Sequence, residues 1–132
     1  MAYKKINSEN TALIYGKMPP QATDLEVVVL GAMMLEPQCI NQVMSIIPKP
    51  ECFYTDAHQR IFASIRRLSN KNVSAHFIAV CNDLRENNEL EMVGGTYYVT
   101  QLTRDVVSGA SIEEEARIVM QKYMMRELIN IA

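Results

Sequence analysis

The stretch TDLEVVVLGAMML, residues 23–35, decides between two fold classes. Its three consecutive valines, Val27–Val29, suit a β-strand as well as a helix. Two features favour the helix: Thr23 or Asp24 can cap it by accepting a hydrogen bond from a free backbone N–H, and the valines lead into Gly-Ala-Met-Met-Leu. We therefore predict a helix to about Leu35. Because this helix is apolar on nearly every side, it should be central and buried.

The chain on either side of this stretch is divided by helix-start and helix-stop signals. Prolines that begin or end helices and side chains that can cap them separate several apolar segments of helical period. The expected helices run from Pro37 to about Ile47, from Asp56 to about Asn70, from Ser74 to about Asn88 and from Thr96 to Thr103. With the first and last helices, these predict an all-α fold, a compact bundle of about six helices. Between two of them, residues 51–54 should form a tight turn that tucks Phe53 inward.

The last helix is predicted to run from Ile112 to the end of the chain. Ser111 can accept a hydrogen bond from the N–H of Glu114, whose carboxylate can reach back to the N–H of Ser111. Successive residues of a helix are rotated by about 100°, which places two apolar stripes on this one. The first stripe, expected to dock on the bundle, is Ile112, Ala116, Val119, Met120 and Tyr123, continued by Met124, Leu128 and Ile131. The second stripe, on nearly the opposite side, is Ile118, Met125 and Ile129.

The second stripe of the last helix has two interpretations. Single exposed apolar residues are normal on any protein surface. Three aligned residues, in a helix that ends without a glycine cap or a proline, favour a covering partner, and the chain looks cut inside or just after a helix. The predicted protein interface is Ile118, Met125, Ile129, Met124 and Leu128. Residues 1–21 should form a flexible arm, residues 22–110 the bundle and residues 111–132 the terminal helix.

Charge and cysteine content limit the function classes. The formal net charge of −2 argues against a domain built mainly to hold nucleic acid. One small basic cluster, interpreted as a solvated helix face that leaves only a weak single-stranded DNA contact open, is Arg60, Arg66, Arg67 and Lys71. Three cysteines at unrelated spacings and two histidines predict neither a disulfide framework nor a metal site. Free cysteines, no signal peptide and no apolar run of membrane-spanning length predict a cytoplasmic protein without membrane contact.

The glycine pair Gly94-Gly95 is the one place that could suggest a phosphate site. A P-loop requires G-x-x-x-x-G-K-[ST], and neither this pair nor Gly16-Lys17 fits it. The pair is interpreted as a corner between two helices, and no cofactor is expected in this chain. His58, which could act as an acid or base with Asp56 or Glu51, is more often a surface or capping residue in such a place.

Four stretches carry a resemblance that none of them would carry alone. They are PPQATDLEVVVLGAMMLE (19–36), CFYTDAHQRIFASIRRL (52–68), LEMVGGTYYVTQL (90–102) and SGASIEEEARIVMQKYMMRELI (108–129). In this order they resemble the N-terminal domain of the bacterial replicative DNA helicase of the DnaB type, over about residues 17–132. The chain departs from the family pattern at Val27 or Val28, where a second acidic residue is frequent, at Ala75, where aspartate is usual, and at Ser111, where asparagine is common.

The resemblance implies a small all-helical domain that pairs head to head through a helical hairpin. In the family this domain forms a collar, a trimer of dimers, on a hexameric ATPase ring, and it is implicated in ring assembly, contact with primase and response to loader proteins. Residues 111–132 would begin the hairpin. DNA unwinding, ATP and magnesium would belong to a RecA-like domain after Ala132, and this chain alone would not be an enzyme.

Two rival hypotheses remain from the sequence. The chain could be a free-standing helical adaptor that mimics the helicase collar. It could also be a small enzyme that uses His58 with Asp56 or Glu51, although no motif supports such an activity.

Overall fold

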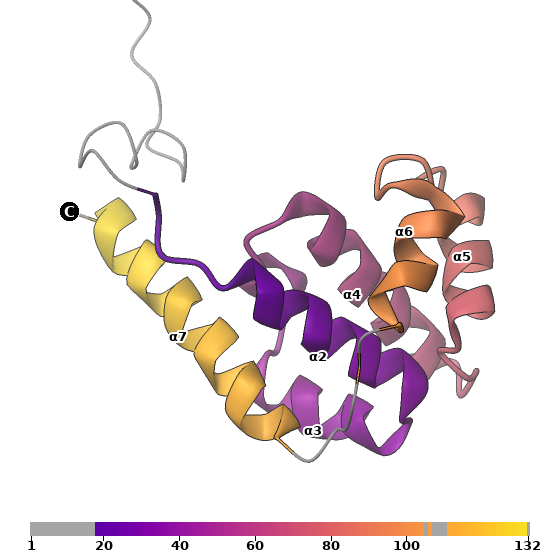
Figure 1. Ribbon diagram of the computed structural model, residues 1–132, viewed down its shortest axis with the longest axis horizontal. Coiled ribbons are helices and arrows are strands. Elements are labelled where there is room, and N and C mark those ends of the chain that lie inside the picture. The colour runs from indigo at the N-terminus through magenta and orange to yellow at the C-terminus, as the bar shows by residue number, and fades with distance from the viewer. Residues whose placement is uncertain (1–17, 105, 107–110, 132) are drawn as a thin grey trace, which may run out of the picture.

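The computed structural model describes residues 18–104, 106 and 111–131, and all regular structure in them is helical (Figure 1). The elements are α2 (Thr23–Leu35), α3 (Gln38–Ile46), the 3₁₀ turn η1 (Pro50–Cys52), α4 (Asp56–Asn70), α5 (Phe77–Glu86), α6 (Gly95–Leu102) and α7 (Ile112–Ile131). The predicted all-α bundle of about six helices is confirmed. None of the helices within the described ranges combines the length and the apolar character that crossing a membrane requires.

Helix α2 occupies the centre of the bundle, as its apolar sequence predicts. It packs against α3, α4, α6 and α7. The side chains of Val29, Leu30 and Ala32 are fully buried, and burying a side chain the size of leucine stabilises the fold by about 1.5–3 kcal/mol. Gly31 lies against the backbone of α6, because a Cβ atom built on it would stand 2.1 Å from the carbonyl oxygen of Leu102.

The start of α2 differs from the prediction in its cap. Ala22 occupies the cap position, and neither Thr23 nor Asp24 caps the helix with its side chain. Instead, Oε1 of Gln21 accepts the N–H of Thr23 at 3.0 Å. Several side chains near this helix start can accept a backbone N–H. The conformation of the chain before the helix places Gln21, rather than Thr23 or Asp24, in position to do so.

Helix α4 begins at Asp56 as predicted, whereas α5 begins later than expected. The carboxylate of Asp56 accepts from Arg60 one turn later at 2.8 Å. Helix α5 spans Phe77–Glu86, shorter than the predicted range from Ser74 to Asn88. His76 caps it by accepting the N–H of Ile78 at 3.4 Å.

Two predicted corners are confirmed. Gly94 and Gly95 have φ angles of +110° and +76°, in the left-handed region where glycine is favoured, and α6 begins at Gly95. The turn at η1 places Phe53 inward, where it is fully buried and its ring centroid lies 5.1 Å from that of Phe62.

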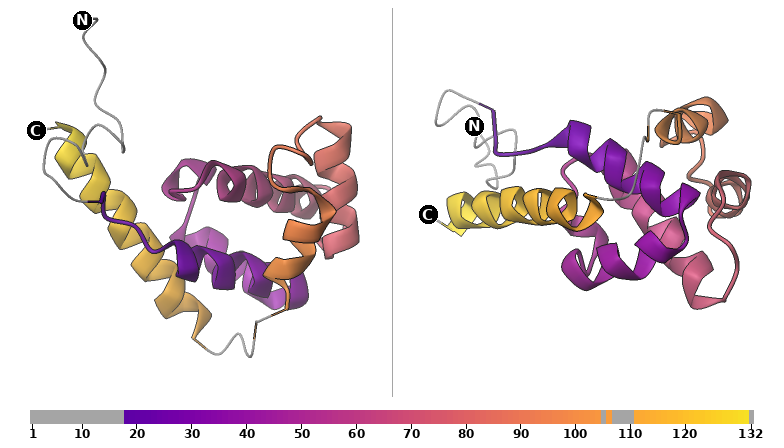
Figure 2. Two further views of the ribbon diagram at one scale, coloured as in Figure 1. Left: turned by 45° about the horizontal axis from the view of Figure 1, so that its top comes forward. Right: turned by 60° about the horizontal axis from the view of Figure 1, so that its bottom comes forward.

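Helix α7 begins at Ile112 as predicted, and its first half docks on α2 and α3. Ile112, Ala116 and Val119 are buried there. The second half leads away from the bundle, and the extended segment 18–22 runs beside it in each view (Figures 1 and 2). Most of the predicted flexible arm lies outside the described residues, whereas Pro19 in its last part is buried.

Candidate protein–protein interface

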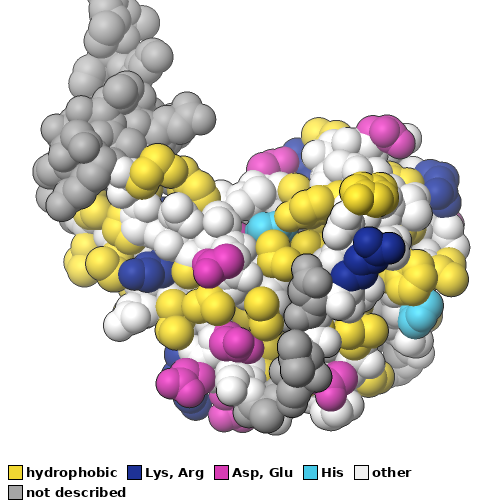
Figure 3. All heavy atoms as spheres, viewed as in Figure 1, with side chains coloured by type: hydrophobic (Ala, Val, Ile, Leu, Met, Phe, Trp, Pro, Cys, Tyr) yellow, Lys and Arg dark blue, Asp and Glu magenta, His cyan; other side chains and the backbone are white. Residues whose placement is uncertain are grey.

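The second half of α7 exposes large apolar side chains to solvent. Met124, Met125 and Leu128 are 56%, 41% and 69% exposed. Ile118 and Ile129 are half-buried beside them. We call these five residues the α7 outer face; apolar side chains gather over this part of the molecule in the space-filling view (Figure 3). Most other large apolar residues of the described chain are packed in the core, so this group is a candidate contact surface.

The assignment of Met124 and Leu128 to the docked stripe was wrong. With about 100° of rotation per residue, these positions lie about 120° and 160° away from Ile112 around the helix axis. At that distance from the docked direction the bundle no longer covers them. The predicted interface already named all five residues, and the structure places them together on one broad outer face.

The residue that continues the docked face is charged. Arg126 is only 7% exposed. Its Nη1 donates to the carbonyl oxygen of Pro20 at 2.8 Å, and its Nη2 donates to the carbonyl oxygen of Cys52 at 3.1 Å. The guanidinium also lies 5.3 Å from the ring centroid of Tyr54 and 5.9 Å from that of Tyr123. Burial lowers the pKa of Arg126, and the nearby charge of Glu26 acts in the opposite direction.

Sequence reasoning missed Arg126, although its spacing carried a signal. Fourteen residues after Ile112 it returns to within about 40° of the docked direction. A charged side chain on a helix is normally assigned to the solvent side, because burial of an unpaired charge is costly. Here the guanidinium is satisfied by carbonyl oxygens and aromatic rings.

A second buried polar group links α2, α4 and α6. Glu26 and His58 have 1% and 2% of their side chains exposed, with 2.8 Å between Oε1 and Nδ1. Nε2 of His58 lies 2.6 Å from the hydroxyl of Tyr98. Oε2 of Glu26 also accepts the backbone N–H of Tyr54 at 2.7 Å. Burial, followed by the charge of Glu26, raises the pKa of Tyr98.

This network corrects the expectation for His58. The side chain is not at the surface and does not cap a helix, and it faces Glu26 rather than Asp56 or Glu51. Both ring nitrogens are held by protein groups within hydrogen-bond distance. With both nitrogens partnered and the side chain only 2% exposed, the arrangement supports a structural role and adds no support to the acid–base hypothesis. Tyr98 serves this network, whereas the adjacent Tyr97 is 71% exposed.

Two residues of the predicted basic cluster, Arg60 and Arg67 of α4, form ion pairs with carboxylates. Arg60 pairs with Asp56 at 2.8 Å and with Glu89 at 2.7 Å. Arg67 pairs with the buried Asp83 at 2.6 Å. These pairs tie α4 to α5 and to the turn after it, so two of the four basic side chains face carboxylates rather than solvent alone.

The remaining two basic residues are placed differently. Nη1 of Arg66 donates to the carbonyl oxygen of Pro48 at 3.1 Å, and its guanidinium lies 6.0 Å from the ring centroid of Phe62. Lys71 is exposed in the turn after α4. The surface is therefore a mixed one, which offers little attraction to a phosphate backbone.

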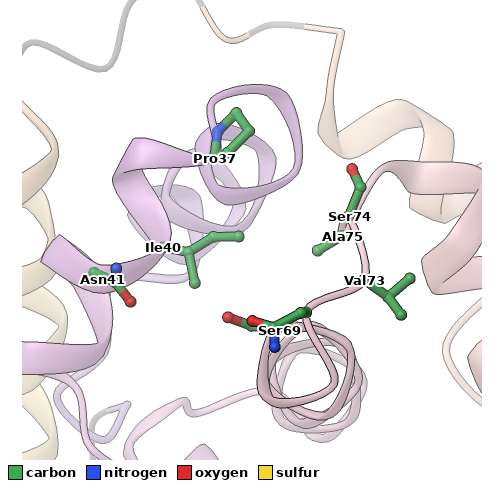
Figure 4. A pocket seen from close by; sticks show the side chains of 8 residues that line it. Pro37, Ile40, Asn41, Ser69, Val73, Ser74 and Ala75 are labelled. Carbon is green, nitrogen blue, oxygen red and sulfur yellow. The ribbon is translucent and has the colours of Figure 1, made fainter.

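The hollows of the surface do not suggest a reaction centre. One of about 280 Å³ lies between the start of α3 and the end of α4, where Pro37 and Ile40 face Ser69 and Ala75 (Figure 4). Its lining residues carry no titratable side chain. Another, of about 430 Å³, is lined by Asp56, Arg60, Glu89 and neighbouring residues and does not include His58. No group of three or more metal-ligating side chains occurs within the described ranges.

Comparison with known proteins agrees with the fold. The family described as "DnaB-like helicase N terminal domain" matches residues 18–121. The chain is 43% identical over 116 residues to the replicative DNA helicase DnaB of Rhodothermus marinus, covering 88% of this chain and 12% of that protein. It is 35% identical to that of Geobacillus stearothermophilus, covering 88% of this chain and 25% of that protein.

A solved structure gives the same result in three dimensions. The crystal structure of the N-terminal domain of DnaB helicase from Mycobacterium tuberculosis matches with a TM-score of 0.81 and 31% sequence identity, covering 85% of this chain and 80% of that one. The chain spans a quarter or less of the length of the two full-length relatives above. From the family match over most of its length and the shared helical fold, the chain belongs to the family of DnaB-like helicase N-terminal domains.

Proposed function

We propose that this chain is the collar domain of a replicative DNA helicase, and that it supports assembly of the helicase ring in the cytoplasm during DNA replication. The single observation that carries this proposal is the α7 outer face, an apolar surface on a domain whose relatives are replicative helicases. Because those relatives are helicases rather than small adaptor proteins, the helicase collar is favoured over the free-standing adaptor.

In this proposal the α7 outer face is buried against another copy of the chain or against the second helix of a hairpin. Self-pairing of this kind, repeated around a ring, would give the dimer and trimer-of-dimers arrangement that the resemblance implies. A stable interface of standard size buries about 1,600 Å² in total. One helix face supplies only part of that area, so this chain by itself should associate weakly and in a concentration-dependent way.

The remaining functions belong to the whole protein. Duplex unwinding with ATP and magnesium, and the contact with DNA, are assigned to a part of the protein outside this chain, because no P-loop is present in it. Primase and a helicase loader are the proposed docking partners of the collar. Isothermal titration of the chain with the cognate primase would test the first of these contacts, and the absence of any heat or of a saturable signal would count against it.

The test of self-association uses two exposed residues of the α7 outer face. Sedimentation velocity of the unmodified chain should show a sedimentation coefficient that rises with concentration. The double variant Met125→Asp with Leu128→Asp should remain monomeric, because it places two charges in the surface to be buried. Both side chains are exposed, so circular dichroism should show an unchanged helix content.

A matched control makes the same chemical change on another face. Met92 and Ile78 are each 57% exposed and lie away from α7. Met92→Asp with Ile78→Asp should leave the association unchanged. A strictly monomeric unmodified chain at high concentration, or equal loss of association in both double variants, would argue against the proposal.

A further inference from the structure

The position of Arg126 raises a question about how the α7 outer face is held. Past Val119, Arg126 is the buried side chain among the described residues of α7. The half of the helix that carries Met124, Met125 and Leu128 therefore combines the partial packing of Tyr123 against the core with a polar anchor at Arg126. A polar contact of this kind is directional, because hydrogen bonds weaken steeply when their angles change.

The partners of Arg126 come from distant parts of the chain. Pro20 precedes it by 106 positions and Cys52 by 74. Both accept through backbone carbonyl oxygens, one in the extended segment 18–22 and one at the end of η1. The planar guanidinium can donate in two directions at once, which a lysine ammonium on a flexible stem does less well. The geometry therefore joins three segments at one side chain.

The second of these segments is itself fixed from the other side. The residue after Phe53, Tyr54, donates its backbone N–H to Oε2 of Glu26 at 2.7 Å. Glu26 in turn contacts His58 in the core. The turn is thus held between Arg126 and the buried network. The contact therefore fixes the direction of α7 relative to the core of the bundle.

The first segment is held at Ala22, where it joins α2, and at Pro20. Residues 18–22 lead into α2, where the carbonyl oxygen of Ala22 accepts the N–H groups of Leu25 and Glu26 at 3.0 Å each. Arg126 holds the preceding carbonyl of Pro20. The segment runs along the outer half of α7 as a strap (Figure 2).

We propose that Arg126 is a positioning residue that clamps the strap 18–22 and the η1 turn to α7, and so sets the direction in which the α7 outer face is presented. The inference deepens the proposed function and rests on it for the identity of the presented surface. Linkage is reciprocal: a partner that holds α7 in place also stabilises the docked strap, and a force that lifts the strap weakens the partner contact.

The test is amide hydrogen exchange by mass spectrometry on the full chain at about 1 µM, a dilution chosen to limit the weak association expected of a small interface. The variant Arg126→Gln removes the positive charge and the planar guanidinium donors while keeping a residue of similar helix propensity. Exchange should become faster in peptides covering residues 19–26, 49–56 and the outer half of α7. Exchange should stay unchanged in α4 and α5. A general loss of stability would increase exchange in those two helices as well.

The control is the same change on the same helix. Arg117 is 64% exposed and pairs with Glu113 one turn away at 3.5 Å. Arg117→Gln should leave the exchange of all three segments unchanged. Identical exchange in Arg126→Gln and the unmodified chain would overturn the proposal, as would an increase spread evenly over the molecule.

A milder variant keeps the test decisive if Arg126→Gln does not fold. Arg126→Lys retains the charge and should show the same regional pattern with a smaller amplitude; an exchange pattern identical to that of the unmodified chain would also overturn the clamp.

Sedimentation then separates the two proposals. If the unmodified chain associates, Arg126→Lys should weaken association about fivefold or more with the outer face intact. If the unmodified chain never associates but the regional exchange pattern appears, the clamp stands and the proposed function fails.

Discussion

Nδ1 of His58 lies 2.8 Å from Oε1 of Glu26, and both side chains are almost completely enclosed. Glu26 belongs to α2 and His58 to α4, and Tyr98 of α6 completes the group through Nε2 of His58. The same carboxylate accepts the N–H of Tyr54 in the turn before α4. The buried acidic residue of a mostly apolar helix thus satisfies polar groups from two other segments, which explains how it is tolerated in the core.

Replacing Glu26 with glutamine should destabilise the fold although the two side chains have nearly the same shape. Oε2 accepts the N–H of Tyr54 at 2.7 Å and Oε1 accepts the N–H of Thr55 at 3.5 Å, so the NH₂ of a glutamine would face a backbone donor in either orientation. We expect the free energy of unfolding to fall by about 1–3 kcal/mol in urea titrations followed by circular dichroism. Glu91→Gln, at an exposed position, should change it by less than about 0.5 kcal/mol. Equal effects in the two variants would contradict the role of the network.

The two adjacent tyrosines of α6 offer a paired comparison. Tyr98→Phe removes the hydroxyl that lies 2.6 Å from Nε2 of His58, and the nitrogen is then left without its partner in the core. Unfolding free energy should fall by about 1–3 kcal/mol. Tyr97→Phe removes a hydroxyl from a side chain that is 71% exposed and should have an effect below about 0.5 kcal/mol. A larger loss at Tyr97 than at Tyr98 would reverse our assignment.

Gly31→Ala tests the contact between α2 and α6 through the sign of its effect. Helix propensity alone predicts that alanine stabilises a helix interior by about 1 kcal/mol over glycine. A Cβ at this position would stand 2.1 Å from the carbonyl oxygen of Leu102 and 2.6 Å from a methyl group of Val106. Overpacking of this kind costs about 1–3 kcal/mol or more, so a lower melting temperature is expected. A higher one would show that α6 can move away without loss.

Acid should weaken the fold partly through Asp83. Burial acts to raise the pKa of this carboxyl, but hydrogen bonds and charge from Arg67 outweigh it, so the pKa lies below the ordinary aspartate value. The contribution to stability is therefore complete above the ordinary value and is lost as the pH falls through the folded-state pKa.

The measurement for Asp83 is the urea midpoint between about pH 6 and pH 2.5, a range that spans the ordinary carboxyl titration. Asp83→Asn should lower the midpoint near neutrality and flatten its decline towards acid. Asp24→Asn, at an exposed position, should leave most of the decline in place. A decline of unchanged steepness in Asp83→Asn would show that other carboxyl groups carry it.

Much of the fold could be predicted because its signals are local. Prolines such as Pro48, the glycine corner at Gly94 and the start of the last helix at Ile112 act within a few residues of the chain, and each is found where the sequence indicates. Helix caps were predicted less well. The helix was expected to start at Ser74, whereas α5 starts at Phe77 and His76 caps it. Several side chains near a helix start can accept the same N–H.

The candidate interface was predicted in part. The exposed position of Met125 follows from helical periodicity. Met124 and Leu128 were named in the predicted interface but were also assigned to the docked stripe, and the structure exposes both. Periodicity ranks positions around an axis and does not show how far the bundle reaches along the helix. Full burial of apolar side chains ends near Val119, and beyond it the docked direction holds the partly buried Tyr123 and the buried Arg126.

By itself, the sequence determined the all-α class, the approximate helix bounds and the absence of a P-loop, because these depend on neighbours along the chain. Only the tertiary structure decided that His58 and Arg126 are buried. Their partners are 32 to 106 positions away, and a charged or titratable side chain is tolerated in the interior only where distant segments bring complementary groups to it. That condition is a property of the assembled fold: helical spacing gives the direction of a side chain such as Arg126 but not the distant groups that it meets there.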